Sequence, residues 1–121
     1  MNMIMLKSKI HNARLTECNL DYEGSIQIDT IILEDSGILP YEKVLVVNAS
    51  NGERLETYAI PGKAGSGEFM LNGAAALKGS KGDRVTLMSF CLCEKQDAKK
   101  LRPQIIILDG KDNKIAKKKE I

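Results

Sequence analysis

The sequence has no tryptophan, only one histidine and three prolines, and aromatic residues make up just 4% of it. Proteins that bind single-stranded nucleic acid stack the bases on aromatic side chains, so we expect no nucleic-acid partner. No apolar run approaches the roughly 20 residues needed to cross a bilayer, and we expect no membrane association. The first residues lack a basic segment followed by a long apolar stretch, which argues against a secretory signal and favours a cytoplasmic protein.

Cysteine is also scarce, with Cys18, Cys91 and Cys93 making an odd number. Cys91 and Cys93 lie two positions apart in an apolar run, so they would face the same side of a strand. A Cys-x-Cys pair without a second pair, in a chain with one histidine, is a poor zinc signature. We therefore expect buried, reduced thiols that act as small apolar residues, with no metal site and no disulfide.

A chain of 121 residues is long enough for one domain with a hydrophobic core. The apolar fraction of 43% and the charged fraction of 28% are ordinary for a soluble globular protein. The net charge is only +2, and many of the cations gather at the C-terminus, in Lys111, Lys114, Lys117, Lys118 and Lys119. Residues 111–121 are therefore predicted to form a flexible, solvated tail.

The pattern of the first half predicts short strands separated by turns. Residues 25–29 alternate, with Ile26 and Ile28 on one side of a strand. Residues 30–35 could form a short helix, with Asp29 or Thr30 as the N-cap and Gly37 just past the end. Residues 43–48 and 54–60 read as two strands of a hairpin, in which Asn51-Gly52 would supply two positive φ angles.

The second half continues this pattern. Further strands are predicted at residues 68–71, 84–93 and 104–109, with one helical turn at 74–78 and a brief helix within 94–101. Pro103 would end that helix. Many short strands with few helices indicate a mainly-β domain that spans residues 1–121. A closed barrel would remove the exposed sheet edges of such a domain.

Polar and small residues occur between these elements in a distinctive order. They are Lys9 and His11, then Tyr22-Glu23-Gly24-Ser25, then Arg54, Thr57 and Tyr58, and then Asn72-Gly73-Ala74-Ala75. With this order and spacing the chain resembles the aspartate 1-decarboxylases, small enzymes that make β-alanine from aspartate with a pyruvoyl group. The resemblance extends from about Met5 to Arg102-Pro103. Val47 stands where some relatives carry a bulkier aromatic residue, which affects packing rather than the chemistry.

The resemblance implies a double-psi β-barrel that assembles as a homotetramer, with active sites between neighbouring subunits. It also implies self-cleavage into residues 1–24, the β chain, and 25–121, the α chain. Ser25 Oγ would attack the Gly24 carbonyl, and the resulting ester would eliminate and hydrolyse to leave a pyruvoyl group at position 25. Gly24 would tolerate a strained backbone during this step. Thr57 matches the residue that stabilises the oxyanion, and Asn72 matches a second polar group near the cleavage site.

In the mature enzyme of this family, the substrate amine forms a Schiff base with the pyruvoyl group, which accepts the electrons released with CO2. Tyr58 matches the proton donor, and a phenol carries its proton at neutral pH. Arg54 is the best candidate to bind a substrate carboxylate, and Lys9 is a second cation for a dianionic substrate. Thr57 and the backbone of the small residues Gly73, Ala74 and Ala75 would also contact the substrate. His11 has no role that the sequence explains.

Taken alone, these residues have simpler interpretations. Gly24-Ser25 would be a turn, Arg54 a surface arginine beside a hairpin, and Lys9 a solvated lysine that shares a face with Lys7. In a regular strand Arg54 and Tyr58 share a face while Thr57 points the other way. All three side chains could reach one reaction centre if the strand bends. Alternatively, the two faces of the strand could serve different sites across a subunit interface.

The leading hypothesis is a pyruvoyl-dependent aspartate decarboxylase that feeds β-alanine into pantothenate and coenzyme A synthesis. One alternative is a pyruvoyl decarboxylase of another acidic amino acid, and a second is a non-catalytic β-barrel binding module. The sequence leaves open whether cleavage is spontaneous or requires a maturation helper protein, and how complete it is. It also leaves open which subunit supplies each site residue.

Overall fold

The computed structural model describes residues 1–119, which form nine strands and three short helices. The strands are β1 (Asn2–Arg14), β2 (Glu17–Asn19), β3 (Ser25–Asp29), β4 (Lys43–Asn48), β5 (Arg54–Gly62), β6 (Phe69–Asn72), β7 (Arg84–Glu94), β8 (Gln104–Leu108) and β9 (Ile115–Lys119). The helices are α1 (Thr30–Ser36), the 3₁₀ helix η1 (Gly73–Lys78) and α2 (Lys95–Ala98). Of these helices, none has the length and apolar character needed to cross a bilayer.

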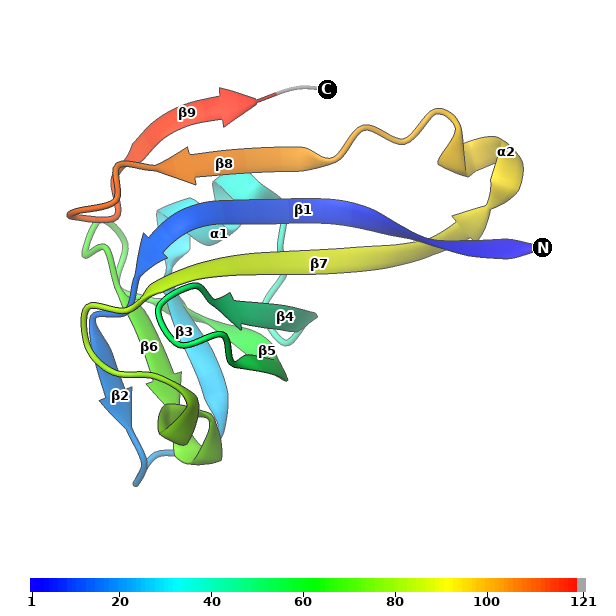
Figure 1. Cartoon of the computed structure of the whole chain (residues 1–121). Coiled ribbons are helices and arrows are strands. Elements are labelled where there is room, and N and C mark those ends of the chain that lie inside the picture. The colour runs from blue at the N-terminus through cyan, green and yellow to red at the C-terminus, as the bar shows by residue number, and fades with distance from the viewer. Residues whose placement is uncertain (120–121) are drawn as a thin grey trace.

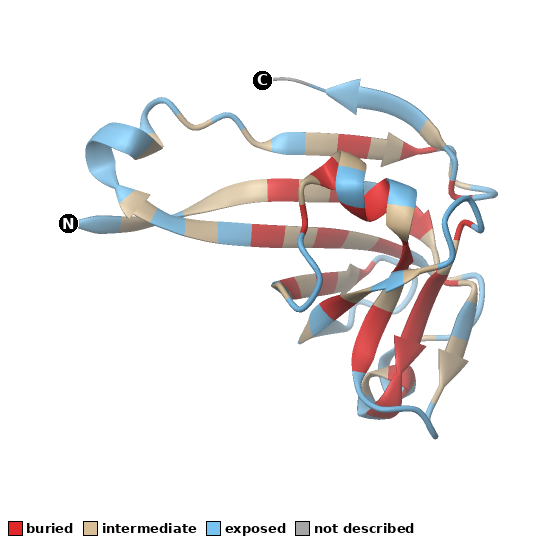
Figure 2. Cartoon of the chain, turned by 180° about the vertical axis from the view of Figure 1, so that it is seen from behind, coloured by how far each residue is buried: buried red, intermediate tan, exposed pale blue. Residues whose placement is uncertain are grey.

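All nine strands belong to one mixed sheet with the order β2-β6-β3-β5-β4-β7-β1-β8-β9. The sheet curls around a single core, as Figures 1 and 2 show. Three neighbouring pairs, β1–β8, β2–β6 and β3–β5, run parallel, and the others run antiparallel. The largest fully buried side chains include Phe69, Ile10, Leu15 and Ile26. The predicted mainly-β, barrel-like fold with a few short helices is therefore confirmed.

Asp29 organises the segment that follows β3. Its carboxylate accepts a hydrogen bond from the Ile31 N–H (2.9 Å), which caps α1, and others from the N–H groups of Gly65 (3.0 Å) and Gly67 (2.9 Å). Gly37 ends the helix with φ = 75°, in the left-handed region. The helix with Asp29 as its N-cap and Gly37 past its end was therefore predicted correctly, to within one residue.

The hairpin between β4 and β5 is also present, but its turn differs from the prediction. Val47 pairs with Arg54, and Gly52 has φ = 77°, whereas Asn51 is not in the positive-φ region. The Asn51 side chain instead accepts a hydrogen bond from the Glu53 N–H at 2.9 Å. This side-chain turn satisfies the backbone, and so the expectation of two positive φ angles was wrong.

The C-terminal segment is more ordered than the lysine content suggested. Residues Ile115–Lys119 form β9, which pairs antiparallel with β8, and Lys118 forms an ion pair with Asp35 at 3.3 Å. The prediction of a frayed tail is therefore wrong for these five residues, because backbone pairing holds a strand whose side chains, apart from Ile115, are exposed. Residues 120–121 of the predicted tail lie outside the described residues.

The ends of β1 and β7 extend beyond the barrel as a two-stranded ribbon. Pairing with β8 involves only residues 8–11 of β1, and pairing with β4 involves only residues 85–88 of β7. Residues 2–6 and 90–94 therefore pair with each other alone, and Figure 1 shows them projecting away from the body toward α2. We refer to these two segments as the β1–β7 ribbon. Its two cysteines, like Cys18, are free and half-buried rather than fully buried as expected.

Candidate active site

Ser25 is the first residue of β3 and is almost completely buried, with 2% of its surface exposed. It lies opposite Asn72 in the antiparallel pairing of β3 with β6, and Asn72 Nδ2 donates a hydrogen bond to Ser25 Oγ at 3.3 Å. Asn72 Oδ1 is buried and has no hydrogen-bond partner. Buried polar atoms are nearly always paired, so this unpaired oxygen beside a buried serine makes the position a candidate functional site.

The backbone of Gly73 abuts that of Gly24. Gly73 has φ = 69°, and a Cβ atom there would lie 2.6 Å from Gly24 Cα and 2.7 Å from Gly24 N. Gly24 itself is not among the residues with positive φ, and a Cβ there would meet only Asn72 O, at 3.9 Å. In the uncleaved chain, therefore, neither crowding nor a left-handed conformation requires glycine at position 24. The steric requirement for glycine falls on position 73 instead.

Strand β5 brings Thr57 and Tyr58 to the start of β3, near the Gly24–Ser25 bond. The parallel pairing of β3 with β5 begins with Ile26 opposite Ala59. Thr57 and Tyr58 directly precede Ala59 along the chain, just as Gly24 and Ser25 directly precede Ile26. This placement supports the predicted grouping of Thr57 and Tyr58 around the cleavage site.

The two faces of β5 carry different residues, as simple strand alternation predicts. Arg54 and Tyr58 are exposed, Thr57 is half-buried, and Ala59 is fully buried. The pairing of β5 with both neighbours shows no bulge. The strand therefore does not bring Thr57 onto the face of Arg54 and Tyr58 by a change of register.

The outer face of strands β5, β4, β7 and β1 carries the predicted cations Arg54 and Lys9, and also His11. Arg54 pairs with Val47, which pairs with Thr86, and the Thr86 hydroxyl lies 3.5 Å from His11 Nδ1. Lys9 lies one row away, opposite Met88. Three strand spacings, about 14 Å at the backbone, separate Arg54 from His11. Long side chains can converge across this distance, because the intervening Val47 and Thr86 are short.

Arg54 is free to bind an anion. Its acidic neighbours are already paired, since Glu53 contacts Lys78 at 2.7 Å and Glu56 contacts Lys43 at 2.6 Å. Within residues 1–119, neither Arg54 nor Lys9 forms an ion pair or a side-chain hydrogen bond. Arg54 is exposed beside the hairpin turn, as its simpler interpretation expects, and it lacks a carboxylate partner within residues 1–119.

Tyr41 is a residue that the sequence did not single out. Its ring lies 6.2 Å from that of Tyr58, centroid to centroid, at an interplanar angle of 31°. Its N–H donates to the Ala59 carbonyl at 2.7 Å, and its φ of 70° is unusual for a bulky residue. The contact orients the Tyr58 ring. Pro40 signals a turn at this point of the sequence, but nothing local predicts the left-handed backbone or the stacking partner.

The small residues that follow Asn72 form the 3₁₀ helix η1, one residue earlier than the predicted helical turn. Ala74 is exposed and Ala75 is half-buried. Because their side chains are single methyl groups, a ligand can approach the backbone here closely. Asn72, which contacts Ser25, directly precedes these three residues, Gly73, Ala74 and Ala75.

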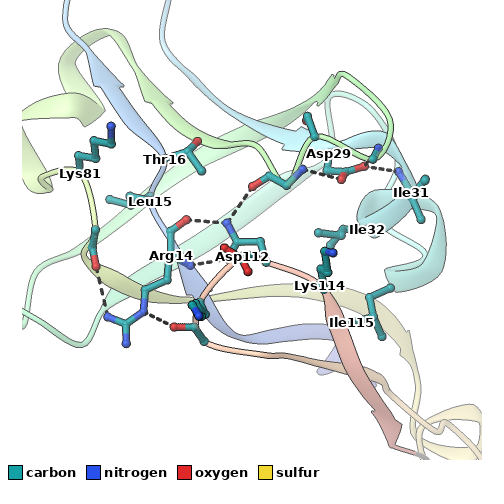
Figure 3. Close-up of a pocket in the computed structure, with 17 residues that line it drawn as sticks. Arg14, Leu15, Thr16, Asp29, Ile31, Ile32, Lys81, Asp112, Lys114 and Ile115 are labelled. Atoms are coloured by element: carbon teal, nitrogen blue, oxygen red, sulfur yellow. Dashed lines mark hydrogen bonds between the residues drawn. The ribbon is translucent and has the colours of Figure 1, made fainter.

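A cavity of about 1030 Å³ lies elsewhere in the fold, lined by Arg14, Asp29, Lys81 and Lys114 among others (Figure 3). Its wall is tied together by Asn113, whose Nδ2 donates to the carbonyls of Gly67 and Arg14, at 2.8 Å in each case. Within residues 1–119, none of the predicted site residues lines this cavity. A single copy of the chain therefore does not enclose those residues in its large cavity.

Comparison with known proteins identifies the family. The sequence profile of the family described as aspartate decarboxylase matches residues 1–116. The chain belongs to this family.

Individual relatives agree with the family match along nearly the whole chain. An aspartate 1-decarboxylase of Carboxydothermus hydrogenoformans is 52% identical, over 99% of this chain and 94% of the relative. One from Prosthecochloris aestuarii is 53% identical, over 93% and 88%, and one from Syntrophobacter fumaroxidans is 48% identical, over 94% and 91%. The resemblance seen in the sequence is thereby confirmed. The roles of individual residues stay predictions.

Proposed function

We propose that this member of the aspartate decarboxylase family converts L-aspartate to β-alanine and CO2, using a pyruvoyl group derived from its own Ser25. The β-alanine would serve the synthesis of pantothenate and coenzyme A. One observation carries the proposal: a buried serine contacts the half-paired amide of Asn72, beside a glycine backbone that is held against Gly73. These features are what a peptide bond prepared for internal attack requires.

In the proposed processing, Ser25 Oγ bonds to the Gly24 carbonyl carbon while the C–N bond breaks, which converts the peptide into an ester. Elimination then releases the Gly24 carboxylate and leaves dehydroalanine at position 25. Addition of one water to its imine form expels one ammonia and leaves the pyruvoyl group. Thr57, on the strand that pairs with β3, would donate a hydrogen bond to the oxyanion of the first step. Asn72 would hold Ser25 Oγ.

The residues present fit such a group. The Asn72 Nδ2 donor lies next to position 25, where a carbonyl oxygen of the group could accept its hydrogen bond. The absence of a Cβ atom at Gly73 lets the two backbones approach closely beside it. When formed, the pyruvoyl group supplies an electron sink for the pair of electrons released with CO2. The protein itself supplies binding, orientation and a proton.

Arg54 would bind a carboxylate of aspartate, since its guanidinium has two parallel N–H groups and no carboxylate partner in the described part of the chain. Lys9 is the second cation for the dianionic substrate. Tyr58 would donate the proton that replaces CO2 at the α-carbon, because its hydroxyl forms no hydrogen bond with residues 1–119 and its ring is held against Tyr41.

We further propose a homotetramer in which the active sites lie between subunits. Arg54 and Tyr58 lie on the outer face of β5, whereas Thr57 lies on the other. Exposed apolar residues on neighbouring elements, including Leu39, Tyr41 and Phe90, offer a surface that a second subunit can cover. The cytoplasmic location and the need for a helper protein stay predictions.

The decisive experiment is intact mass spectrometry of the purified chain, followed by an assay for β-alanine. We expect cleavage between Gly24 and Ser25 into pieces of 24 and 97 residues. The larger piece should be lighter by one ammonia than a fragment that begins with serine. Ser25→Ala, which removes only the nucleophile, should remain one polypeptide and produce no β-alanine.

Two results would contradict the proposal. One is a wild-type chain that remains intact after prolonged warming with and without cell extract, where the extract supplies any helper protein. The other is β-alanine formation by a pure Ser25→Ala sample. Supplying L-glutamate in place of L-aspartate separates the proposed substrate from a longer acidic amino acid.

A further inference from the structure

The β1–β7 ribbon carries four sulfur-containing side chains on one face. The antiparallel register places Met3 opposite Cys93 and Met5 opposite Cys91. Directly opposed residues point to the same side of the sheet, and so do residues two positions apart on a strand. All four residues are half-buried. They continue the inner face of β7, beyond the point where the barrel core ends.

The opposite face of the ribbon has a different character. Ile4 and Leu92 oppose each other there and are 75% and 65% exposed, and Phe90 is 44% exposed. Simple apolar side chains thus occupy the outer face, while the inner-face residues of these two segments, Met3, Met5, Cys91 and Cys93, all contain sulfur. Pairing of the strands places both sulfur-containing segments on the same face.

Pairing of the two strands gathers these four side chains into one patch on the inner face of the ribbon. Opposed Cβ atoms in an antiparallel pair are about 4.5–5.5 Å apart, and neighbours along one face of a strand are about 7 Å apart. Desolvation raises the pKa of Cys93, and the charge of Cys91 raises it further. The two thiols lie two residues apart on the same face of β7, and neither forms a disulfide.

Two thiols and two thioethers are soft ligands, which favour Cu(I) over the hard cations that prefer oxygen. Within residues 1–119, no group of three His, Cys, Asp or Glu side chains is placed to hold a metal ion. A metal site on the ribbon therefore requires the methionine thioethers as ligands in addition to the two thiols. We propose that Met3, Met5, Cys91 and Cys93 form a binding site for one Cu(I) ion. Binding displaces a proton from each thiol and requires no change of oxidation state.

The test is a titration of the reduced, full-length protein with Cu(I) without oxygen, in competition with the chromophoric chelator bathocuproine disulfonate. We expect one equivalent to bind, with a thiolate-to-copper absorption band in the ultraviolet. The double variant Cys91→Ser/Cys93→Ser should lose both the binding and the band. Cys18→Ser is the matched control, because Cys18 lies on β2, away from the ribbon, and it should bind as the wild type does.

The double variant Met3→Leu/Met5→Leu tests the thioethers with little change in volume. Loss of a group that only orients a metal ligand costs about 10- to 100-fold in affinity, so loss of two ligands should weaken binding by at least that factor. Circular dichroism of each metal-free variant establishes that it is folded.

Unchanged affinity in the methionine variant would overturn the four-sulfur site, as would the absence of a one-to-one complex in the wild type. Zn²⁺ binding as tight as that of Cu(I) would overturn the assignment to a soft ion. The Ser25→Ala protein should bind the same single equivalent, which separates this site from the proposed enzymatic function.

Discussion

Replacement of Gly73 by alanine tests the central steric feature of the site. The new Cβ atom would lie 2.6 Å from Gly24 Cα, 2.7 Å from Gly24 N and 3.0 Å from the Tyr22 carbonyl oxygen. All three are backbone atoms, so no flexible side chain can move aside. Either η1 or the Gly24 backbone must shift, and the geometry between Ser25 Oγ and the Gly24 carbonyl changes with it.

The magnitude can be estimated from two contributions. A left-handed conformation costs a residue other than glycine about 1–2 kcal/mol. Overpacking of a filled site costs about 1–3 kcal/mol more, giving a total of roughly 2–5 kcal/mol. A misplacement of about 1 Å at a reacting centre can slow a reaction about 100-fold, and we expect cleavage of Gly73→Ala to slow by about this factor.

Gly52→Ala is the matched control. Gly52 has φ = 77°, but a Cβ atom there would have no neighbour within 4 Å. This variant therefore carries the conformational strain without the clash. The assay follows cleavage of freshly purified protein by mass spectrometry, together with thermal unfolding of each variant. Equal cleavage rates for Gly73→Ala and Gly52→Ala would refute the idea that Gly73 positions the scissile bond.

Three further substitutions separate the proposed roles on β5, with cleavage and β-alanine release measured independently in each. Thr57→Val should slow cleavage about 100- to 1000-fold if its hydroxyl acts as an oxyanion donor, and normal cleavage would exclude that role. Tyr58→Phe should still cleave but release β-alanine at least about 100-fold more slowly, and an unchanged turnover rate would mean that another group donates the proton. Arg54→Lys should also cleave, with a raised KM for aspartate, because an ammonium cannot reproduce the two parallel hydrogen bonds; an unchanged KM would remove Arg54 from the binding site.

Much of the fold followed from local patterns in the sequence. The alternation around Ile26 and Ile28, the cap at Asp29 and the stop at Gly37 each depend on a few adjacent residues, and the structure has all of them. The 3₁₀ helix after Asn72 was also close to its prediction. Such features are predictable because the groups that stabilise them lie within one turn or one strand.

The errors arose where distant contacts decide the structure. The C-terminal lysines suggested a solvated tail, but pairing with β8 satisfies the backbone of β9 while its lysines stay in water. The Asn51 side chain replaced the expected second positive φ by bonding to the Glu53 N–H. The contact of Tyr41 with Tyr58 requires the segment before β4 to meet strand β5, and no short sequence pattern predicts it.

The same limit applies to the site. The sequence suggested Gly24 as the residue chosen for its conformational freedom. The crowding in the uncleaved chain lies instead at Gly73, which directly follows Asn72, the residue paired with Ser25. The motif is therefore informative as a set, because it includes both residues. The assignment of a physical role to each member required the register between β3 and β6.

The two faces of β5 lead to a last consequence. Thr57 lies on one face of β5, and Arg54 and Tyr58 lie on the other, with no bulge between them. If processing depends on Thr57 while substrate binding depends on Arg54, then variants should separate the two reactions: a Thr57 variant should lose cleavage, whereas an Arg54 variant should cleave and then use aspartate poorly. A chain that bent β5 to bring all three side chains to one centre would instead show both defects in every variant. The strand geometry thus makes self-processing and turnover separable by mutation, although both depend on position 25.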